Sequence, residues 1–455
     1  MAEIALDYTY RYQRPSEVAW TDGKPQLSLT TSGVGEQPAL FFRGNLVRPR
    51  LCADLLLALV RVVHSRFCLP PNMLARIKVL SDPVITCGED RLRFETFSAC
   101  CGVYGRVDLL PEAVAGSLLA TGTTNVDFNP PMRAALAQLQ DSEPAALTVG
   151  AEAVDLESGG QTQVERKVAL PLRWLKGFVE VQAHQARMIQ RFEVSGAEAR
   201  RFLQGLPRQG TSGLAAWVAR VGPGLRLSML GGPGSVRVGG IERLRLLEDI
   251  VRHAHILRAY GAADSEASAW EVDCGMARMF VVLSPETWRS FSGEGQALSH
   301  LAETLPAASV ECVRQALGWQ PRVNVVALAQ RCALEPARIE SALARLGARG
   351  LVGYDLAEGA YFHRELPFDL SLVEALQPRL TAARQLLADG GVQLITDTPE
   401  RIEAWVRGAD CEYHVRITPE ARLCTCPWLA KHPDDRGPCK HILAVQLATG
   451  DADDA

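Results

Sequence analysis

The feature that most constrains this chain is a run of three cysteines and one histidine near its C-terminal end. The stretch CTCPWLAKHPDDRGPCKH occupies residues 424–441, with Cys424 and Cys426 one residue apart and Cys439 and His441 spaced likewise. Twelve residues separate the two pairs, so the spacing is C-x-C-x12-C-x-H. Thiolate and imidazole groups are the ligands that hold Zn2+ in a tetrahedron. The pattern therefore predicts one zinc site.

The alternative without a metal is that these four residues are small buried cysteines and a core histidine. Single cysteines fit that alternative, but two close pairs joined by a polar, turn-forming loop favour a metal. Pro427 and Pro438 stiffen the chain beside each pair. A helix that begins at Cys439 would also favour a thiolate there, because the helix dipole stabilises negative charge. His432, inside the loop, is a competing ligand to His441.

Three thiolates and one imidazole fill a tetrahedral shell, whereas catalytic zinc keeps a position open for water. The sequence therefore predicts a structural zinc ion. In small zinc modules the binding energy, about 10–16 kcal/mol, is folding energy. Removing the metal is expected to unfold roughly the last 60 residues and nothing else.

The residues around the four ligands have the order of a small mixed module. VQLITD, RIEAWVRG and EYHVRIT read as three strands, and CKHILAVQLA reads as a helix that follows the second ligand pair. This arrangement, with Cys-Pro after the first pair and Cys-Lys-His before an apolar helix, resembles the SWIM zinc finger over residues 392–449. The resemblance selects His441 rather than His432 as the fourth ligand. More widely, GTTNVDFNPP and AYFHRELPFD look like a bacterial SWIM family.

The resemblance also implies partners. SWIM modules are thought to bind either DNA or proteins, and bacterial SWIM proteins are associated with MoxR-type AAA+ ATPases and von Willebrand A proteins. No residue of this chain points to such partners by itself.

Composition places the chain among ordinary globular proteins. It has 455 residues, of which 47% are hydrophobic and 22% charged, so about three domains and a sizeable core are expected. The apolar run of residues 51–63 is broken by Asp54 and Arg61 and is too short to cross a bilayer. The N-terminus lacks the basic and apolar regions of a signal peptide. We expect a cytoplasmic protein without a membrane span, whose scattered cysteines (Cys52, Cys68, Cys87, Cys274, Cys312, Cys332 and the adjacent Cys100 and Cys101 of a strand) are structural.

Charge is distributed unevenly around the net value of -4. Residues 163–261 contain sixteen Lys and Arg against seven Asp and Glu, and a surplus of this size can attract nucleic acid or another polyanion. Basic residues spread over such a length are more often a solvated face. Residues 391–455, in contrast, contain seven basic and eleven acidic residues, which suits phosphates poorly.

Residues 305–367 resemble a winged helix. VECVRQALGW, VNVVALAQRCAL and ARIESALARLGARG read as three helices, and LVGYDLAEGAYFHREL reads as a hairpin. In DNA-binding members the third helix enters the major groove, which makes Arg338, Arg345 and Arg349 candidate nucleic-acid contacts. The segment has only seven basic against six acidic residues, including Asp355 and Glu358 in the wing. This balance favours a docking or structural role over DNA binding.

Several short motifs predict where individual helices and turns begin. Ser195 with Glu198 has capping-box spacing and Ser284 precedes Pro285, so each is expected to start a helix. Residues 222–240 read as two strands joined by a glycine-rich turn. Asn129-Pro130-Pro131 is expected to keep GTTNVDFNPP irregular. His253 and His255 look metal-like, but on a helix they would diverge.

These observations predict a multidomain α+β chain. The expected units are an N-terminal α+β domain (1–150), a basic α+β domain (151–304), a winged-helix-like unit (305–370), a connecting helix (371–390) and a SWIM zinc finger (391–455). No zinc-protease, nucleophile-elbow, phosphate-loop or kinase motif is present in the sequence. We expect a non-catalytic zinc-binding adaptor that mediates protein–protein interaction. The alternative is a DNA-binding protein that uses the winged helix, the basic segment and the finger.

Overall fold

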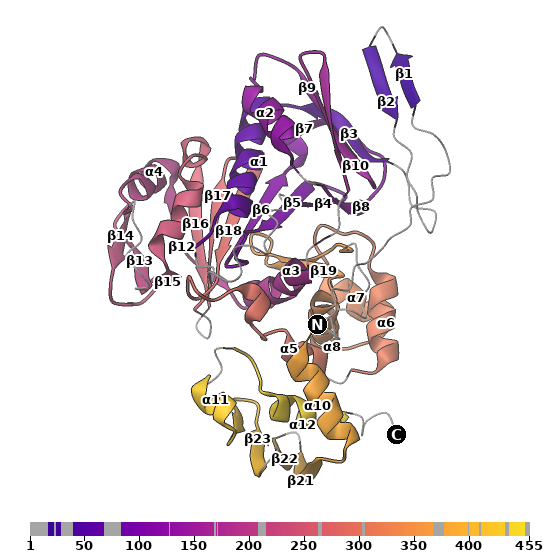
Figure 1. Ribbon diagram of the computed structural model, residues 1–455, viewed down its shortest axis with the longest axis vertical. Coiled ribbons are helices and arrows are strands. Elements are labelled where there is room, and N and C mark those ends of the chain that lie inside the picture. The colour runs from indigo at the N-terminus through magenta and orange to yellow at the C-terminus, as the bar shows by residue number, and fades with distance from the viewer. Residues whose placement is uncertain are drawn as a thin grey trace.

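The computed structural model describes residues 17–21, 24–28, 40–67, 83–126, 128–167, 170, 172–207, 215–262, 266–302, 305–366, 377–398, 400–408, 411–432 and 436–450. The chain mixes helices with several sheets, as expected for the α+β class (Figure 1). Cys68, residues 367–376 and the acidic C-terminal residues 451–455 lie outside the described residues. Among the helices that the structure describes, none is both long and apolar enough to span a bilayer.

The largest sheet has eight antiparallel strands in the order β12-β16-β17-β18-β6-β5-β4-β8. Its strands are β4 (Val84–Cys87), β5 (Leu92–Phe97), β6 (Val103–Leu109), β8 (Gly122–Asn125), β12 (Ile189–Ser195), β16 (Ile256–Gly261), β17 (Ser268–Asp273) and β18 (Ala277–Leu283). β6 pairs with β18 over its whole length. The sheet therefore takes strands from both of the ranges 1–150 and 151–304. Every residue of β4, β5 and β6 is buried, because both faces of the sheet are covered.

One face of this sheet is covered by α1 (Pro49–His64). The helix begins with Pro49, whose missing N–H costs nothing in the first turn. Leu51, Leu55, Leu59 and Val62 recur at helical spacing and are buried against β5 and β6. The helical spacing of apolar residues in the stretch LCADLLLALVRVVHSRF, residues 51–67, predicts this amphipathic helix, and the structure confirms it.

The opposite face carries an aromatic cluster beneath α3 (Leu172–Gln185) and the 3-10 helix η5 (Phe291–Gly293). Phe97 of β5 lies edge-on to Phe178 of α3, with ring centroids 5.0 Å apart. Tyr104 and Trp174 complete the contact between strand and helix. Edge-to-face aromatic packing of this kind fixes α3 on the sheet.

A second sheet has five strands in the order β11-β10-β9-β3-β7. Its strands and the elements beside it are β3 (Leu40–Leu46), β7 (Val114–Leu118), β9 (Ala145–Gly150), β10 (Ala153–Ser158), β11 (Gln161–Arg166), η2 (Pro111–Ala113) and α2 (Pro130–Gln138). The expectation of an irregular GTTNVDFNPP was wrong. Its first residues form β8, and Pro130 and Pro131 are the first residues of α2, where proline is tolerated. Asn129 caps that helix by accepting a hydrogen bond from the Met132 N–H at 3.0 Å.

A third sheet, of order β14-β13-β15, lies beside α4. The elements of this region are α4 (Gly196–Gln204), β13 (Ala215–Val221), β14 (Gly224–Ser228), β15 (Val236–Gly239), η3 (Ile241–Leu247) and η4 (Val251–His253). Ser195 caps α4 as predicted, and the two strands expected over residues 222–240 form, each paired with β13 rather than with each other. The helix expected after Ser284 does not form. The buried Ser284 hydroxyl instead hydrogen-bonds to the carbonyls of Glu286 and Arg289, and these contacts hold the chain in a tight loop.

Residues 298–363 form a bundle of helices and one hairpin. The elements are α5 (Leu298–Ala302), α6 (Ala307–Ala316), α7 (Val325–Cys332), α8 (Pro336–Ala348), β19 (Val352–Asp355) and β20 (Ala360–His363). Three helices followed by a hairpin is the order expected from the sequence. Ile339, Leu343 and Leu346 of α8 are buried against α6 and α7.

The β19–β20 hairpin is docked on the eight-stranded sheet through buried charges. Asp355 is fully buried and faces Arg91 and Arg93 of the β4–β5 region and Arg106 of β6. Its Oδ1 lies 2.9 Å from Arg106 Nη2, and Asp108 accepts from Arg93 Nε at 2.7 Å. Although burial favours a neutral carboxyl, the neighbouring guanidinium groups hold the pKa of Asp355 well below its usual value.

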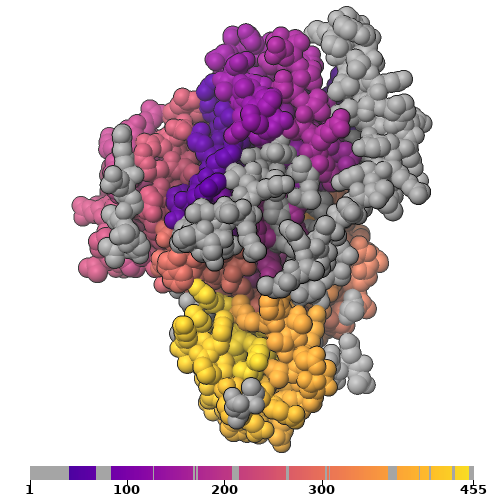
Figure 2. All heavy atoms as spheres, viewed as in Figure 1, coloured from indigo at the N-terminus to yellow at the C-terminus, as the bar shows by residue number. Residues whose placement is uncertain are grey.

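The C-terminal residues form a lobe of their own below the larger sheets (Figures 1 and 2). Its elements are α10 (Pro378–Ala388), β21 (Val392–Thr398), β22 (Arg401–Arg407), β23 (Glu412–Ile417), β24 (Arg422–Cys424), α11 (Pro427–Lys431) and α12 (Lys440–Gly450). The four strands form one antiparallel sheet in chain order. The three predicted strands and the last helix are confirmed, and β24 and α11 are additions. Near the N-terminus, β1 (Glu17–Thr21) and β2 (Lys24–Ser28) form a separate hairpin.

Candidate metal centre

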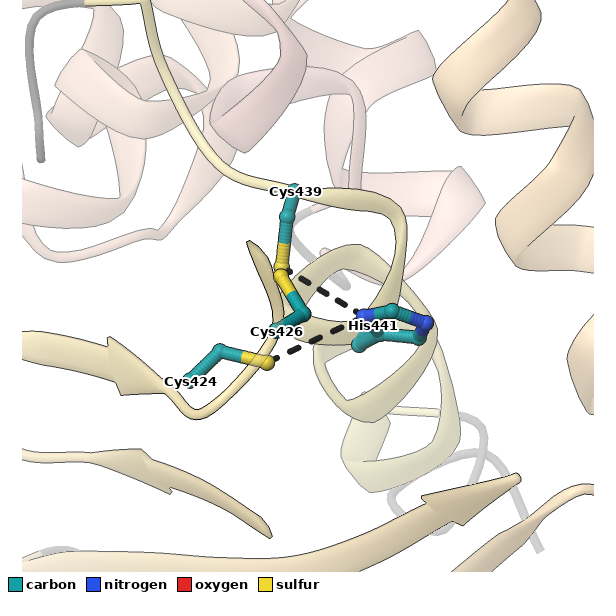
Figure 3. A group of neighbouring side chains, drawn as sticks. All are labelled: Cys424, Cys426, Cys439 and His441. Carbon is teal, nitrogen blue, oxygen red and sulfur yellow. Dashed lines mark hydrogen bonds between the residues drawn. The ribbon is translucent and has the colours of Figure 1, made fainter. Parts of the chain in front are cut away.

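Two turns of chain bring the four predicted ligands together. Cys424 is the last residue of β24, and Cys426 caps α11, accepting a hydrogen bond from the Leu429 N–H at 3.5 Å. Cys439 and His441 lie at the start of α12, where Cys439 Sγ accepts from the Ile442 N–H at 3.5 Å. A strand end and two helix starts thus point their side chains at one position (Figure 3).

The spacing of the donor atoms fits a tetrahedral ion. One donor atom from each of the four residues lies within 4.8 Å of all the others. His441 Nδ1 is 3.8 Å from Cys424 Sγ and 3.9 Å from Cys439 Sγ (Figure 3). Zinc–sulfur and zinc–nitrogen bonds of about 2.3 and 2.0 Å at tetrahedral angles put sulfur about 3.5 Å from nitrogen. The cluster is therefore compatible with one structural zinc site, which three sulfurs and one nitrogen would fill.

Burial separates this cluster from an open catalytic site. Cys426, Cys439 and His441 are 1%, 2% and 4% exposed, and Cys424 is half-buried. The cysteines belong to an apolar core with Val406, Val415 and Ile442, which joins the sheet to α12. A metal here would be enclosed by the unit that it stabilises.

The polar groups around the sulfurs differ in their effect on each thiol. Hydrogen bonds from Cys424 and His441 lower the pKa of Cys439 to about 4, against the opposing effect of burial. Burial raises the pKa of Cys426, and the hydrogen bond to Cys439 raises the pKa of Cys424. Cys439 is thus the thiol that the protein alone favours as a thiolate, as expected at a helix start.

The imidazole of His441 is held by packing. Its ring lies against Tyr413 of β23, with centroids 4.5 Å apart. Its Nε2 is buried and has no hydrogen-bond partner among the residues that the structure describes. The ring therefore presents Nδ1, not Nε2, to the sulfurs.

The loop that carries Cys439 is fastened to the rest of the chain by Arg379 of α10. Arg379 Nη1 donates to the carbonyls of Arg436 and Pro438 at 2.8 and 2.9 Å, and Nη2 donates to the Glu294 carbonyl at 3.1 Å. Its guanidinium also lies 4.7 Å from the ring centroid of Trp428 in α11. One side chain thus joins both halves of the metal centre to the loop before α5.

A backbone contact and two further arginines complete this attachment. A Cβ on Gly437 would stand 1.9 Å from the carbonyl oxygen of Gly295, so only glycine fits at this crossing, where φ is +71°. Arg422 donates to Ser299 of α5. Arg436 lies over the ring of Trp288 at 5.5 Å.

The other histidines that the structure describes in and near the finger, and His253, lie apart from the cluster. His432 is half-buried and its ring tilts against Trp428. His414 faces Trp405 across the sheet, and Cys411 is exposed. His253 bonds to Asp54 at 2.8 Å, in a 3-10 turn and not in a metal site.

The described cysteines outside the finger fall into three groups. Cys52, Cys87 and Cys274 are buried as predicted, and burial raises the pKa of each thiol. The prediction for Cys100 and Cys101 was wrong, because they lie in the turn between β5 and β6, with Cys101 at φ +52°, and not along a strand. Cys312 of α6 and Cys332 of α7 are half-exposed and hydrogen-bonded to each other, a contact that their spacing in the sequence did not indicate.

The candidate nucleic-acid contacts on α8 are only partly accessible. Arg338 is exposed, whereas Arg345 and Arg349 are half-buried, and Arg345 Nη1 lies 3.4 Å from the Leu305 carbonyl. Sequence reasoning missed both Arg379 and the buried position of Asp355. An Arg after a helix-initiating Pro and an Asp in a hairpin are ordinary in sequence, so no signal marked them.

Comparison with known proteins identifies the class of the C-terminal unit as a zinc-binding module. Residues 413–450 match a family model described as SWIM zinc finger. The chain therefore carries a SWIM zinc finger, and the matched residues include Cys424, Cys426, Cys439 and His441.

Comparisons of the whole chain add little. A search of curated proteins found no match. Among solved structures, the chain is similar to proliferating cellular nuclear antigen from Entamoeba histolytica, with 10% identity and a TM-score of 0.37, over 54% of this chain and 99% of that one. A likeness of this size carries no conclusion about fold or function.

Proposed function

We propose that this protein is a non-catalytic scaffold that binds other proteins and is stabilised by one zinc ion, with Cys424, Cys426, Cys439 and His441 as the four ligands. The observation that carries the proposal is the enclosed Cys3His cluster, built into the core that joins the finger's sheet to α12. A full, buried shell leaves no coordination position for a substrate. The metal's contribution is then the fold of a surface and not a reaction.

The position of the three-helix unit supports protein binding over DNA binding. If α6, α7 and α8 with the β19–β20 hairpin are a winged helix, α8 is the helix that would enter a major groove. Yet α8 packs on α3 and α5, and a Cβ on Gly347 would stand 2.6 Å from Gln182 Oε1 of α3. The hairpin is pinned through the buried Asp355. The C-terminal part of α8 and the hairpin are thus packed against the rest of the chain, which favours protein binding over DNA binding.

DNA binding is the second candidate, and the basic surplus of residues 163–261 favours it. Sixteen basic residues against seven acidic ones could neutralise several phosphates. Arg338 on the exposed start of α8 would add one more contact. The acidic balance of residues 391–455 opposes any contribution from the finger.

The partners implied by the SWIM resemblance, a MoxR-type AAA+ ATPase and a von Willebrand A protein, belong to this proposal, as does a cytoplasmic location. Support for them comes from the resemblance alone. Chemical cross-linking in cells that make the protein, followed by mass spectrometry, would identify which proteins contact it and through which residues.

A salt titration separates the two functions. The zinc-loaded chain is mixed with a random fluorescent duplex at salt concentrations from about 20 to 300 mM, and binding is followed by anisotropy. A scaffold shows no binding at the lowest salt. A steep linear fall of log K with log salt, with a slope near −0.9 for each phosphate contacted, would establish the DNA-binding function instead.

A further inference from the structure

Away from the metal centre, an open cavity lies between α4 and the β13–β14 hairpin, on the side of the molecule opposite α6 and α7 in Figure 1. Its volume is about 470 Å3, within the range of about 300–1,000 Å3 typical of ligand sites. The cavity, called here the α4–β14 groove, is lined by Glu198, Arg201, Phe202, Gly205, Leu206, Val221, Pro223, Gly224, Leu225 and Leu227. Most of these side chains are apolar.

The hairpin beside the groove exposes apolar side chains that a free surface would not favour. Val221 and Leu227 in the lining are 46% and 37% exposed. Just beyond β14, Met229 and Leu230 are 55% and 80% exposed. Contiguous exposed apolar residues at a concave site mark a protein-interaction surface more often than a solvated face.

The two charged residues in the lining, Glu198 and Arg201, pair with each other, so the additional charge on the groove face is that of Arg220. Arg201 is 76% exposed at the rim, paired with Glu198, and Arg220 faces the groove side of the hairpin because it pairs with Leu225 across the strands. Arg226 lies on the opposite face of β14, across from Ala219. Among the described residues, neither Arg220 nor Arg226 has an acidic partner within ion-pair distance. An occupant that brings carboxylates would supply what the rim lacks.

The strand β14 is also available for pairing along one edge. It lies at the end of its three-stranded sheet and pairs only with β13 among the described strands. An extended segment can therefore lie along β14 and place alternate side chains in the groove. Residues 208–214, which follow α4 in the chain, contribute a further Arg and no carboxylate, so their charge does not match the rim.

We propose that the α4–β14 groove docks an acidic amphipathic segment of a partner protein, with a large apolar side chain in the cavity and Asp or Glu side chains against Arg201 and Arg220. This inference rests on the scaffold function proposed above and names the surface and the chemistry of the partner. The apolar anchor supplies affinity through burial, and the carboxylates supply orientation.

The test uses the full zinc-loaded chain as bait for a phage library of random 12-residue peptides. Enriched peptides are expected to carry an aromatic or branched apolar residue flanked by Asp or Glu. Two variants probe the groove, Leu227→Asp in its lining and Arg220→Glu at its rim. Two matched controls are Leu119→Asp, a leucine 54% exposed on the five-stranded sheet region, and Arg226→Glu, on the other face of the β13–β14 hairpin.

We expect Leu227→Asp to weaken the enriched peptides at least about tenfold, as for an anchor residue, and Arg220→Glu to weaken them several-fold. Replacing the peptide's Asp or Glu by Lys should recover affinity for Arg220→Glu. Both controls should stay within about twofold. Circular dichroism and zinc content verify that each variant is folded.

Three outcomes would overturn the proposal that the groove docks an acidic segment. They are a library that enriches nothing, enriched peptides that are neutral or basic, and binding that Leu227→Asp and Arg220→Glu leave unchanged. The scaffold function has a separate readout. If Leu227→Asp still cross-links to the same partner proteins as the wild type, the groove proposal is wrong but the scaffold function stands. If neither the wild type nor the variant cross-links to any partner protein, both the groove proposal and the scaffold function are wrong.

Discussion

Glu180 shows how the fold changes the chemistry of a single side chain. It lies fully buried on α3, where Oε2 accepts hydrogen bonds from the N–H groups of Gln296 and Ala297 at 2.8 and 3.3 Å. Burial, helped by the nearby Glu294, raises the pKa of Glu180 to about 8. An unfolded chain would release this proton near pH 4.3. The folded protein therefore holds a proton that the unfolded chain does not.

The sign of the resulting pH dependence follows from that difference. Between about pH 4.3 and 8 the folded state binds more protons, so its free energy of unfolding falls as pH rises, by at most about 1.4 kcal/mol per pH unit. Glu180→Gln should flatten this slope in melting temperatures measured from pH 5 to 8. Glu412→Gln, on an exposed residue of β23, should not. An identical slope in wild type and Glu180→Gln would contradict the assignment.

Cys439 allows a second test at this scale. Because it supplies one of four enclosed donors, Cys439→Ser should lower zinc affinity at least about 100-fold and leave less than one zinc per chain after dialysis. Inductively coupled plasma mass spectrometry measures the stoichiometry. Cys411→Ser, on an exposed cysteine outside the cluster, should keep one zinc per chain.

Between elements, the contact of the β19–β20 hairpin with the eight-stranded sheet depends on buried ion pairs. Asp355 faces Arg93 and Arg106, each nearly or fully buried, and Arg93 is shared with Asp108. Removing one partner of such a cluster leaves buried cations without compensation. The stability of the protein therefore depends on keeping the hairpin docked on the sheet.

Asp355→Ala is therefore expected to cost about 3–5 kcal/mol, seen as a lower urea midpoint and as faster hydrogen exchange in β19 and β20. Glu358→Gln is the matched control, because Glu358 is on the same hairpin but partly exposed, at 3.5 and 3.6 Å from Arg278 and Arg91. It should cost less than about 1 kcal/mol. Equal effects of the two variants would show that the buried cluster does not hold the hairpin.

Arg379 plays the corresponding role between α10 and the metal loop. Arg379→Ala removes its three hydrogen bonds to carbonyls of Glu294, Arg436 and Pro438 without touching a ligand. Zinc should remain at one per chain, while trypsin cleaves faster at Lys431 and Arg436. Arg407 is the exposed last residue of β22, so Arg407→Ala should leave the cleavage rate unchanged. Loss of zinc from Arg379→Ala would place this arginine among the determinants of metal binding.

For the molecule as a whole, the question is how far the metal's influence extends. The finger has its own core around Val415 and Ile442, but Leu443 and Ala444 of α12 pack in another core with α3, α5 and α10. Zinc chelation should therefore raise hydrogen exchange throughout β21–β24, α11 and α12, and to a smaller degree in α5 and α10. The eight-stranded sheet should keep its protection. Exchange confined to residues 392–450 would restore the simpler expectation that only the last unit depends on zinc.

Much of the chain could be predicted from short-range patterns. Apolar spacing placed α1, α8 and the strands of the finger, and Ser195 placed the start of α4, because helix and strand periodicity and capping are local. The C-x-C and C-x-H pairs placed the metal centre for a similar reason, since the spacing of ligands and the chemistry of thiolates are written in the chain. The errors at Pro130 and Ser284 arose where one residue type has two uses. Proline both breaks and begins helices, and serine both caps helices and closes loops.

The sequence by itself predicted a zinc site and the secondary structure around it, because these depend on residues near one another in the chain, and the SWIM resemblance selected His441 over His432 as the fourth donor. Only the tertiary structure decided that β6 pairs with β18 across 168 residues of sequence from Leu109 to Ala277, that Asp355 is buried among arginines, and that Arg379 joins the finger to the body. Such contacts depend on the closure of long loops and on which surfaces lose water together. A charged residue carries no local sign of whether it will meet solvent or a partner, so its role emerges only when distant elements pack.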